Sequence, residues 1–252
     1  QPSPPGHPRG RDRHERVISV AEEALGGGAN AYPEVSAEAF EAELRWRLSR
    51  AYLSAADLGL YGGMEPSRAE ELLTKGIEAA QRAIRLRSPA AEARFWEAAN
   101  RIRRARLEGM VAALLVAGDV RDAVRNVVER EPQHPEAHYM LAQLYTQAPG
   151  FPVSFGDDAK AVSFGKKALA LHRAERSETP YMSVYHDFSI VLAEALLDRD
   201  WSERQRRRRH GRIREAYARA ENAFERSAHY EGSVELPPGS DREEAVMLLE
   251  GT

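Results

Sequence analysis

The stretch AKAVSFGKKALAL, residues 159–171, decides the fold. Its small residues Ala161, Gly165 and Ala168 recur at steps of four and three, which is the spacing of one face of an α-helix. A face of small side chains lets a neighbouring helix approach closely, while the large side chains around it fill the space between helix pairs. The stretch therefore predicts the second helix of a closely packed antiparallel pair.

Helix-start signals recur along the rest of the chain. Capping boxes, in which a hydroxyl and an acid or amide satisfy the first free N–H groups, begin at Ser67, Ser202 and Ser240. Proline occupies a first helical position after Ser88, His134 and Thr179, and further N-caps are Ser36, Asp119 and Asp157. We expect helix pairs starting near residues 36 and 67, 88 and 119, 135 and 157, and 180 and 202. Helices from about Val17 and from Ser240 flank them, and we find no alternating strand.

Small and large residues fill the positions of the tetratricopeptide pattern in each expected pair. The first-helix positions are Leu48, Ser49 and Tyr52; Leu107, Met110, Val111 and Leu114; His138, Leu141, Ala142 and Tyr145; and Leu192, Ala193 and Leu196. Second-helix positions outside the opening stretch are Gly76, Ala80 and Ala83; Ala123 and Val127; and Ala216, Ala220 and Ala223. We predict an all-α stack of about four tetratricopeptide-like antiparallel helix pairs with extra terminal helices. A plain helical bundle is the alternative.

Composition excludes several classes of protein. Hydrophobic residues make up 42% of the 252 residues and charged residues 30%, and the net charge of −3 gives no global attraction to nucleic acid or membrane. The absence of cysteine excludes disulfides, thiolate metal sites and a cysteine nucleophile. No apolar run is long enough to span a bilayer. We expect a disordered Pro- and Arg-rich leader over residues 1–15 and one domain over residues 16–252.

Four segments in the second half carry a family resemblance. LYTQAPG (144–150), FPVSFGDDAKA (151–161), KKALAL (166–171) and LAEALL (192–197) resemble the TatT family, tetratricopeptide lipoproteins associated with TRAP-type (tripartite, ATP-independent periplasmic) transporters. The resemblance covers residues 136–197 well and the flanks only by helix pattern. The basic insertion WSERQRRRRHGRIR (201–214) and the lack of a lipidation cysteine depart from it.

That resemblance implies a periplasmic protein, lipid-anchored in its full-length form, that works with a solute-binding protein or holds a hydrophobic small molecule. It also implies a homo-oligomer. Because the chain begins at Gln1, we expect a trimmed product without its signal peptide or lipidated cysteine. Without the resemblance, the expected location is the cytoplasm.

An enlarged turn, QAPGFPVSFGDD (147–158), separates the two helices of the third pair. Gly150 and Gly156 have the spacing of a phosphate-binding loop, but Asp157 and Asp158 replace its Lys and Ser/Thr, and no strand precedes. Two interpretations stay open: the apolar side chains plug a gap in the stack, or Phe151 and Phe155 form a rim that contacts a partner.

Histidines and arginines offer the remaining candidate chemistry. His134 and His138 have a metal-ligand spacing, but Pro135 lies between them and no further ligand completes a site. His186 and Asp187 are adjacent in a helix and diverge. We expect no catalytic residue, metal or cofactor. The arginine run, Arg204 and 206–209, is either a solvated segment or an anion-binding patch, and nucleic acid is disfavoured because aromatic residues are not interleaved with it.

In a tetratricopeptide stack, the first helices line a concave groove. Mapped by position, this groove comprises Trp46, Arg50, Leu53, Glu108, Ala112, Leu115, Tyr139, Gln143, Thr146, Ile190, Glu194 and Leu197. Such a surface suits a peptide, a helix or an apolar ligand, unless Trp46 and Tyr139 pack against the terminal helices. We therefore expect a non-catalytic interaction scaffold, specifically a TatT-like one. The alternatives are a generic adaptor and an anion or nucleic-acid binder that uses the arginine run.

Overall fold

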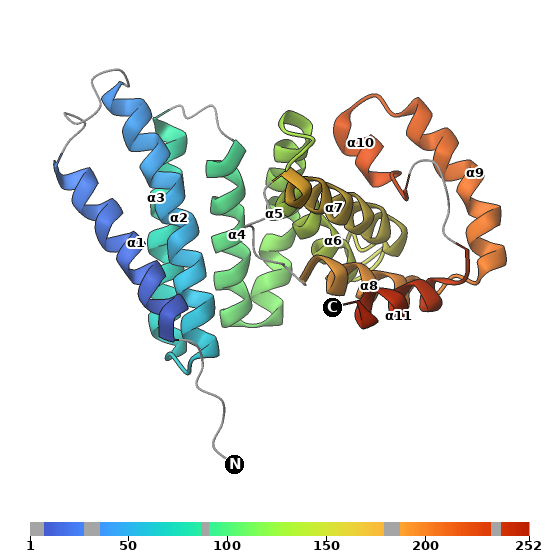
Figure 1. The fold of residues 1–252 in the computed structure, drawn as a ribbon, viewed down its shortest axis with the longest axis horizontal. Helices are drawn as coiled ribbons and strands as arrows, with labels where there is room; N and C mark the ends of the chain where they lie inside the picture. The colour runs from blue at the N-terminus through green and yellow to red at the C-terminus, as the bar shows by residue number, and fades with distance from the viewer. Residues whose placement is uncertain (1–7, 28–35, 87–90, 179–186, 233–237, 252) are drawn as a thin grey trace, which may run out of the picture. The chain divides into compact units, whose positions relative to one another are not determined.

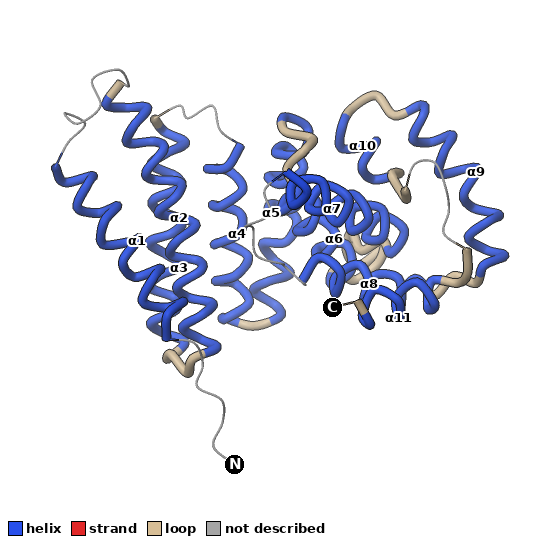
Figure 2. The backbone as a smooth tube through the Cα atoms, in the orientation of Figure 1, coloured by secondary structure: helices blue, strands red, loops and turns tan. Residues whose placement is uncertain are grey.

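Helices account for nearly all the backbone that the computed structural model describes, namely residues 8–27, 36–86, 91–178, 187–232 and 238–251 (Figures 1 and 2). Within these residues the one β-type pairing is an isolated bridge between Gly150 and Gly156. The all-α stack of adjacent helix pairs is confirmed. The chain forms two compact units, Gln1–Ala123 and Val124–Thr252. Each is described separately, and the single domain expected over residues 16–252 stays a prediction.

Unit 1 contains α1 (Pro8–Gly27), α2 (Ala37–Tyr61), α3 (Pro66–Arg85), α4 (Ala91–Glu108) and the first part of α5 (Met110–Arg130). The hydroxyl of Ser36 accepts a hydrogen bond from the Ala39 N–H at 3.2 Å, which confirms that cap. By contrast, α3 begins at Pro66 rather than after Ser67, because proline is preorganised for the first helical position. The core of α1, α2 and α3 is apolar: Ala21, Leu48, Tyr52, Ala55, Ala56, Ala69, Leu72 and Leu73.

Small residues mark the closest helix crossings, as the sequence predicted. A Cβ added to Gly76 of α3 would lie 2.3 Å from Oδ1 of Asn100 in α4. In unit 2, a Cβ on Gly165 would lie 3.2 Å from the Leu192 side chain. Both glycines therefore hold a space that a larger side chain would have to open.

The second helix pair differs from the expected one. α4 ends at Glu108, and Gly109 follows with φ +118°, a conformation that favours glycine and interrupts the helix. α5 starts at Met110, so Asp119 lies inside α5 instead of capping it. The apolar residues that fit a first helix, Leu107 to Leu114, straddle this break and do not form one face.

The N-terminal helix begins earlier than the sequence indicated. α1 starts at Pro8, inside the segment 1–15 expected as a disordered leader, and not near Val17. Arginine favours helix and proline suits a first turn, so the composition of residues 8–15 is compatible with either state. Residues 1–7 lie outside the described residues, as do Ser88, Pro89, Thr179 and Pro180, whose predicted helix starts are untested.

Unit 2 contains the end of α5, then α6 (Pro135–Gln147), α7 (Asp158–Glu178), α8 (Asp187–Arg199), α9 (Glu203–Arg219), α10 (Ala223–Ala228) and α11 (Asp241–Glu250). Capping boxes form at Ser202 and Ser240, and the Asp157 carboxylate accepts from the Lys160 N–H at 3.0 Å. These three predicted helix starts are confirmed.

An aromatic cluster fills the centre of unit 2. The rings of Tyr145 and Phe164 stack with centroids 5.6 Å apart, and Phe164 also contacts Phe224 at 5.3 Å. α8 packs against α7 and α11, rather than forming the expected fourth pair with α9. α9 ends at Arg219, before Ala220 and Ala223. The small-residue face expected for the second helix of that pair is therefore divided between two elements.

Candidate partner-binding surfaces

The predicted groove residues of α2 lie beside α4 in unit 1. The guanidinium of Arg50 lies over the Trp96 ring, 5.2 Å from its centroid, and Asn100 donates to the Ser49 hydroxyl at 3.1 Å. Leu53 is half-buried on the same helix. Trp96 and Asn100 were not predicted, because the first-helix positions of the second pair were assigned to residues 107–114, at the end of α4 and the start of α5.

The described contacts of the Trp46 ring are with residues of its own helix and not with a terminal helix. Its Nε1–H donates to Glu43 at 2.8 Å, and the Arg47 guanidinium lies 4.4 Å from the ring centroid. Both partners belong to α2 itself. The half-buried ring therefore leaves part of its surface for another molecule.

Ala112 and Leu115 are not on a first helix, contrary to the prediction, and Glu108 lies only at the end of one. Glu108 is the last residue of α4 and pairs with Arg104 at 3.6 Å. Leu115 lies on α5, the second helix of its pair, since the break at Gly109 shifts the register.

In unit 2 the structure does bring the predicted residues onto two adjacent helices. The Tyr139 ring of α6 contacts the Phe188 ring of α8 with centroids 5.0 Å apart, and the Tyr139 hydroxyl accepts from Gln143 at 2.9 Å. Thr146 donates to the Ala142 carbonyl of its own helix. On α8, the predicted residues Ile190, Glu194 and Leu197 are exposed. Tyr139 thus packs on α8 and stays half-buried.

The enlarged turn is a hydrogen-bonded loop in which Phe151 and Phe155 differ in exposure, and contact of either with a partner stays a prediction. The Gly156 N–H donates to the Pro149 carbonyl at 2.9 Å, and the Asp157 N–H donates to the Tyr145 carbonyl at 3.1 Å. Phe155 plugs the loop, because its ring meets Tyr145 edge-on at 5.7 Å. Phe151 is 91% exposed, so it forms a rim.

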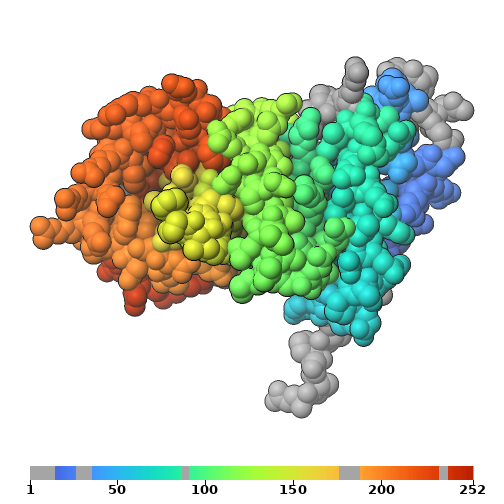
Figure 3. Space-filling model, turned by 180° about the vertical axis from the view of Figure 1, so that it is seen from behind, coloured from blue at the N-terminus to red at the C-terminus, as the bar shows by residue number. Residues whose placement is uncertain are grey.

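The first two turns of α5 carry an apolar patch, of which the sequence predicted Leu115 as a groove residue and the other three as packing positions of a first helix. Met110 is 80% exposed, Val111 74% and Leu115 79%, with Leu114 beside them. Positions 110, 111, 114 and 115 share one face of a helix. Figure 3 shows α5, in green, at the surface of the molecule. Gly109 was the signal that could have revealed this patch, the α5 patch, since a glycine break changes which residues share a face.

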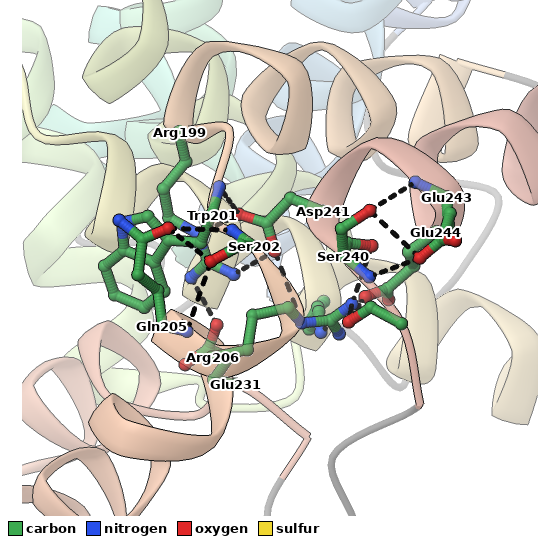
Figure 4. Close-up of polar contacts among 12 residues, drawn as sticks. Arg199, Trp201, Ser202, Gln205, Arg206, Glu231, Ser240, Asp241, Glu243 and Glu244 are labelled. Atoms are coloured by element: carbon green, nitrogen blue, oxygen red, sulfur yellow. Dashed lines mark hydrogen bonds and ion pairs between the residues drawn. The ribbon is translucent and has the colours of Figure 1, made fainter.

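The arginine run divides into one buried residue and several exposed ones. Arg206 is fully buried, and its Nη1 donates to the carbonyls of Gly239 and Ser240 at 3.0 and 2.9 Å. It also pairs with Asp241 and Glu244 (Figure 4). The interpretation as a wholly solvated segment is therefore wrong for Arg206, because acids that lie far along the chain enclose its charge.

Further charges complete this buried network. Arg199 donates to both carboxylate oxygens of Asp241, at 2.7 and 2.9 Å, and pairs with Glu231 (Figure 4). Burial opposes the charged form of Arg199, but the two carboxylates outweigh it and raise its pKa. Burial lowers the pKa of Lys166, which pairs with Glu244 at 3.1 Å. The network fixes the ends of α8, α9 and α11 relative to one another.

The two histidines of the metal-type spacing have protein partners. His134 caps α6 through Nδ1, which accepts from the Ala137 N–H at 3.3 Å. His138 lies 2.8 Å from the His134 carbonyl and 2.9 Å from the Ser227 hydroxyl. Burial lowers the pKa of His138 to about 4. Among the described residues, no group of three or more metal-ligating side chains could hold an ion.

A cavity of about 630 Å³ lies among α1, α2 and α3. Charged side chains line much of it, including Glu22, Arg45, Lys75 and Arg82. The Tyr52 hydroxyl donates to Glu22 at its wall. Leu25 and Leu48 supply a small apolar part of the lining, and binding of the hydrophobic small molecule that the resemblance implied stays a prediction.

A comparison with known families gives a match over the first part of the chain. A family model described as regulator of microtubule dynamics protein 1-3 (RMD1-3) matches residues 21–147, half of the chain. No curated protein matches the chain. The matched range contains α2, α4, the α5 patch and α6, but neither the loop nor α9.

This match overturns the resemblance to TatT. The TatT family assignment is wrong, because the matched family is a different one, and the TRAP-transporter role loses the resemblance on which it rested. The resemblance rested on residues 136–197, where small and large residues alternate at a spacing that many helix-pair stacks share. Such a pattern identifies a fold and does not identify a family.

Proposed function

The chain belongs to the regulator of microtubule dynamics protein 1-3 family, and from this premise we propose that it is a non-catalytic helical scaffold that regulates microtubule dynamics by binding tubulin. The observation that carries the proposal is the α5 patch, which lies inside the matched range. The scaffold needs no cofactor, since its action is binding alone.

The α5 patch is a cluster of large apolar side chains that is exposed instead of buried. Clustered large apolar side chains on a protein surface mark interaction sites, whereas scattered single ones are ordinary. Burying one such side chain contributes about 1.5–3 kcal/mol. Three of them on two turns of helix can therefore supply much of the free energy of a protein contact. A helix with this apolar face fits a groove in a partner.

The backbone beneath the patch is held in place. Ala117 and Val120, which follow the patch on α5, are buried, so the helix is anchored where the exposed side chains end. Arg101 of α4 pairs with Asp119 of α5 at 3.8 Å. A preorganised helix loses little conformational entropy when a partner binds.

Co-sedimentation with polymerised tubulin tests this proposal. We expect the wild-type chain to pellet with microtubules and the double variant Val111→Ser/Leu115→Ser to bind at least tenfold more weakly. The matched control is Val246→Ser/Met247→Ser, which removes two exposed apolar side chains from α11 and should bind as the wild type does. Equal binding by all three proteins, or no binding by any, would refute the proposal.

The proposal does not test the expected location, partner or oligomeric state. No helix among the described residues has the length and apolar character needed to cross a membrane. The periplasmic, lipid-anchored location stays a prediction, but it has lost the family resemblance on which it rested. A solute-binding protein as partner has lost the same support, and a homo-oligomer stays a prediction.

A further inference from the structure

One side chain of α9 determines which face of the helix is directed toward the core. Within α9, all of whose residues are described, only Arg206 is buried. Its contacts with Gly239, Ser240, Asp241 and Glu244 hold the Arg206 face of the helix against the N-terminus of α11. The opposite face of α9 is therefore directed away from the core.

Three arginines form that opposite face. Arg204 and Arg208 are each two residues from Arg206, which places them roughly 200° around a helix of 3.6 residues per turn. Arg212 continues the row by another four residues. All three are exposed, and we call them the α9 stripe. Gly211, next to Arg212, has open space around it.

Among the described residues no acid forms an ion pair with the α9 stripe, and Glu215, which is exposed on the same face of the helix, pairs with Arg219 instead. Within the described residues, the ion pairs along α9 use other arginines: Arg207 pairs with Glu203, and Arg219 pairs with Glu215. Like charges four residues apart destabilise a helix by about 0.2–0.5 kcal/mol per pair. The stripe thus costs stability within the chain, and an anionic partner would offset that cost.

We propose that the α9 stripe binds an extended, acidic segment of a partner protein, with carboxylates on alternate residues. This inference deepens the proposed scaffold function by specifying the chemistry of one partner segment. Residues four apart on a helix are about 6 Å apart along its axis. Alternate side chains of an extended chain are about 6.6 Å apart and point to one side. Three carboxylates can therefore meet the three guanidinium groups in register, each through a two-bonded fork.

Nucleic acid fits the stripe less well. Binding of single strands relies on aromatic rings that stack with bases, and the tryptophan next to the stripe in sequence is Trp201. The Arg199 guanidinium covers Trp201 at 4.0 Å from the ring centroid, and Arg209 lies 5.6 Å from it.

Fluorescence anisotropy with a labelled peptide of twelve alternating glutamates and serines tests the inference on the full chain. The triple variant Arg204→Gln/Arg208→Gln/Arg212→Gln should bind the peptide at least tenfold more weakly than the wild type. The control is Arg16→Gln/Arg85→Gln/Arg173→Gln, which changes net charge equally at exposed arginines elsewhere and should bind normally. Glutamine keeps helix propensity, and circular dichroism confirms that each variant is folded.

Two further probes distinguish other anionic partners. A single-stranded oligonucleotide of equal charge and vesicles containing phosphatidylserine are titrated under the same salt conditions. The inference is overturned if either binds more tightly than the peptide and depends on the stripe, if the triple variant binds the peptide normally, or if the wild type does not bind it. Val111→Ser/Leu115→Ser should keep full peptide affinity, so failure of the stripe and failure of the α5 patch give different results.

Discussion

Nε of Arg206 lies 3.3 Å from Oδ1 of Asp241, and neither side chain has solvent-exposed surface. The same Asp241 accepts from Arg199 and from the Trp201 N–H at 3.0 Å (Figure 4). One carboxylate therefore joins the end of α8, the first turns of α9 and the start of α11. This junction orients the α9 stripe.

Removing the charge of Asp241 should destabilise unit 2 strongly. Asp241→Asn leaves Arg199 and Arg206 buried with fewer acids, and breaking a buried ion pair costs about 3–5 kcal/mol. The measurement is the free energy of unfolding in urea. Glu215→Gln, which breaks the exposed pair with Arg219, is the control and should cost less than about 1 kcal/mol. A similar small loss in the free energy of unfolding for both variants would show that the buried ion pairs of Asp241 do not stabilise the fold.

Two glycines in helices should respond to alanine with opposite signs. Gly76→Ala places a Cβ 2.3 Å from the Asn100 carboxamide, so we expect a loss of about 1–3 kcal/mol from overpacking. Gly118→Ala in α5 meets nothing within 4 Å and should stabilise the chain by about 0.5–1 kcal/mol. Thermal unfolding of the two variants checks this. Stabilisation by Gly76→Ala would contradict the close approach of α3 and α4.

The two loop phenylalanines should contribute very differently to the free energy of unfolding. Phe155→Ala removes the ring that packs on Tyr145 and should lower the free energy of unfolding by about 1–3 kcal/mol. Phe151→Ala removes a ring that is 91% exposed and should change stability by less than about 0.5 kcal/mol. Urea unfolding of both variants shows which of the two rings packs within the fold and which is exposed at the rim of the loop. A large loss for Phe151→Ala would mean that the rim packs within the fold.

Because of His138, the free energy of unfolding should decrease as the pH is lowered. Its pKa is about 4 in the folded chain, below the 6.5 of an exposed histidine. The unfolded chain therefore binds the proton more tightly. The stabilisation is complete above pH 6.5 and is lost as the pH falls toward 4, by on the order of 3 kcal/mol. Urea unfolding between pH 7 and 4.5 measures this slope. His138→Gln should show a shallower slope, and an unchanged slope would assign the effect to other groups.

Local features of this fold could be predicted from the sequence, and non-local ones could not. The helix starts at Ser36, Ser202 and Ser240 depend on residues three positions apart, so their caps were predicted correctly. Gly76 and Gly165 were also recognised as close-crossing positions, because small residues recur at helical spacing.

Burial of Arg206 could not be predicted, because its acid partners lie 35 and 38 residues further along the chain. The α5 patch was missed for a different reason: the single residue Gly109 breaks an apolar periodicity that otherwise reads as continuous. The family was misassigned because close helix packing selects the same small residues in many stacks. Of the predicted groove, the α2 and α6 sets and Glu108 lie on first helices, whereas Leu115 lies on α5, a second helix, and α8 does not form the expected pair with α9.

The growth and shrinkage rates of single microtubules, measured by fluorescence microscopy with the purified chain, test the central claim most directly. We predict that the wild type and Val246→Ser/Met247→Ser change these rates equally, whereas Val111→Ser/Leu115→Ser leaves them at their values in buffer. If the wild type has no effect, or if the α5-patch variant acts as the wild type does, the account of this chain as a tubulin-binding scaffold is wrong.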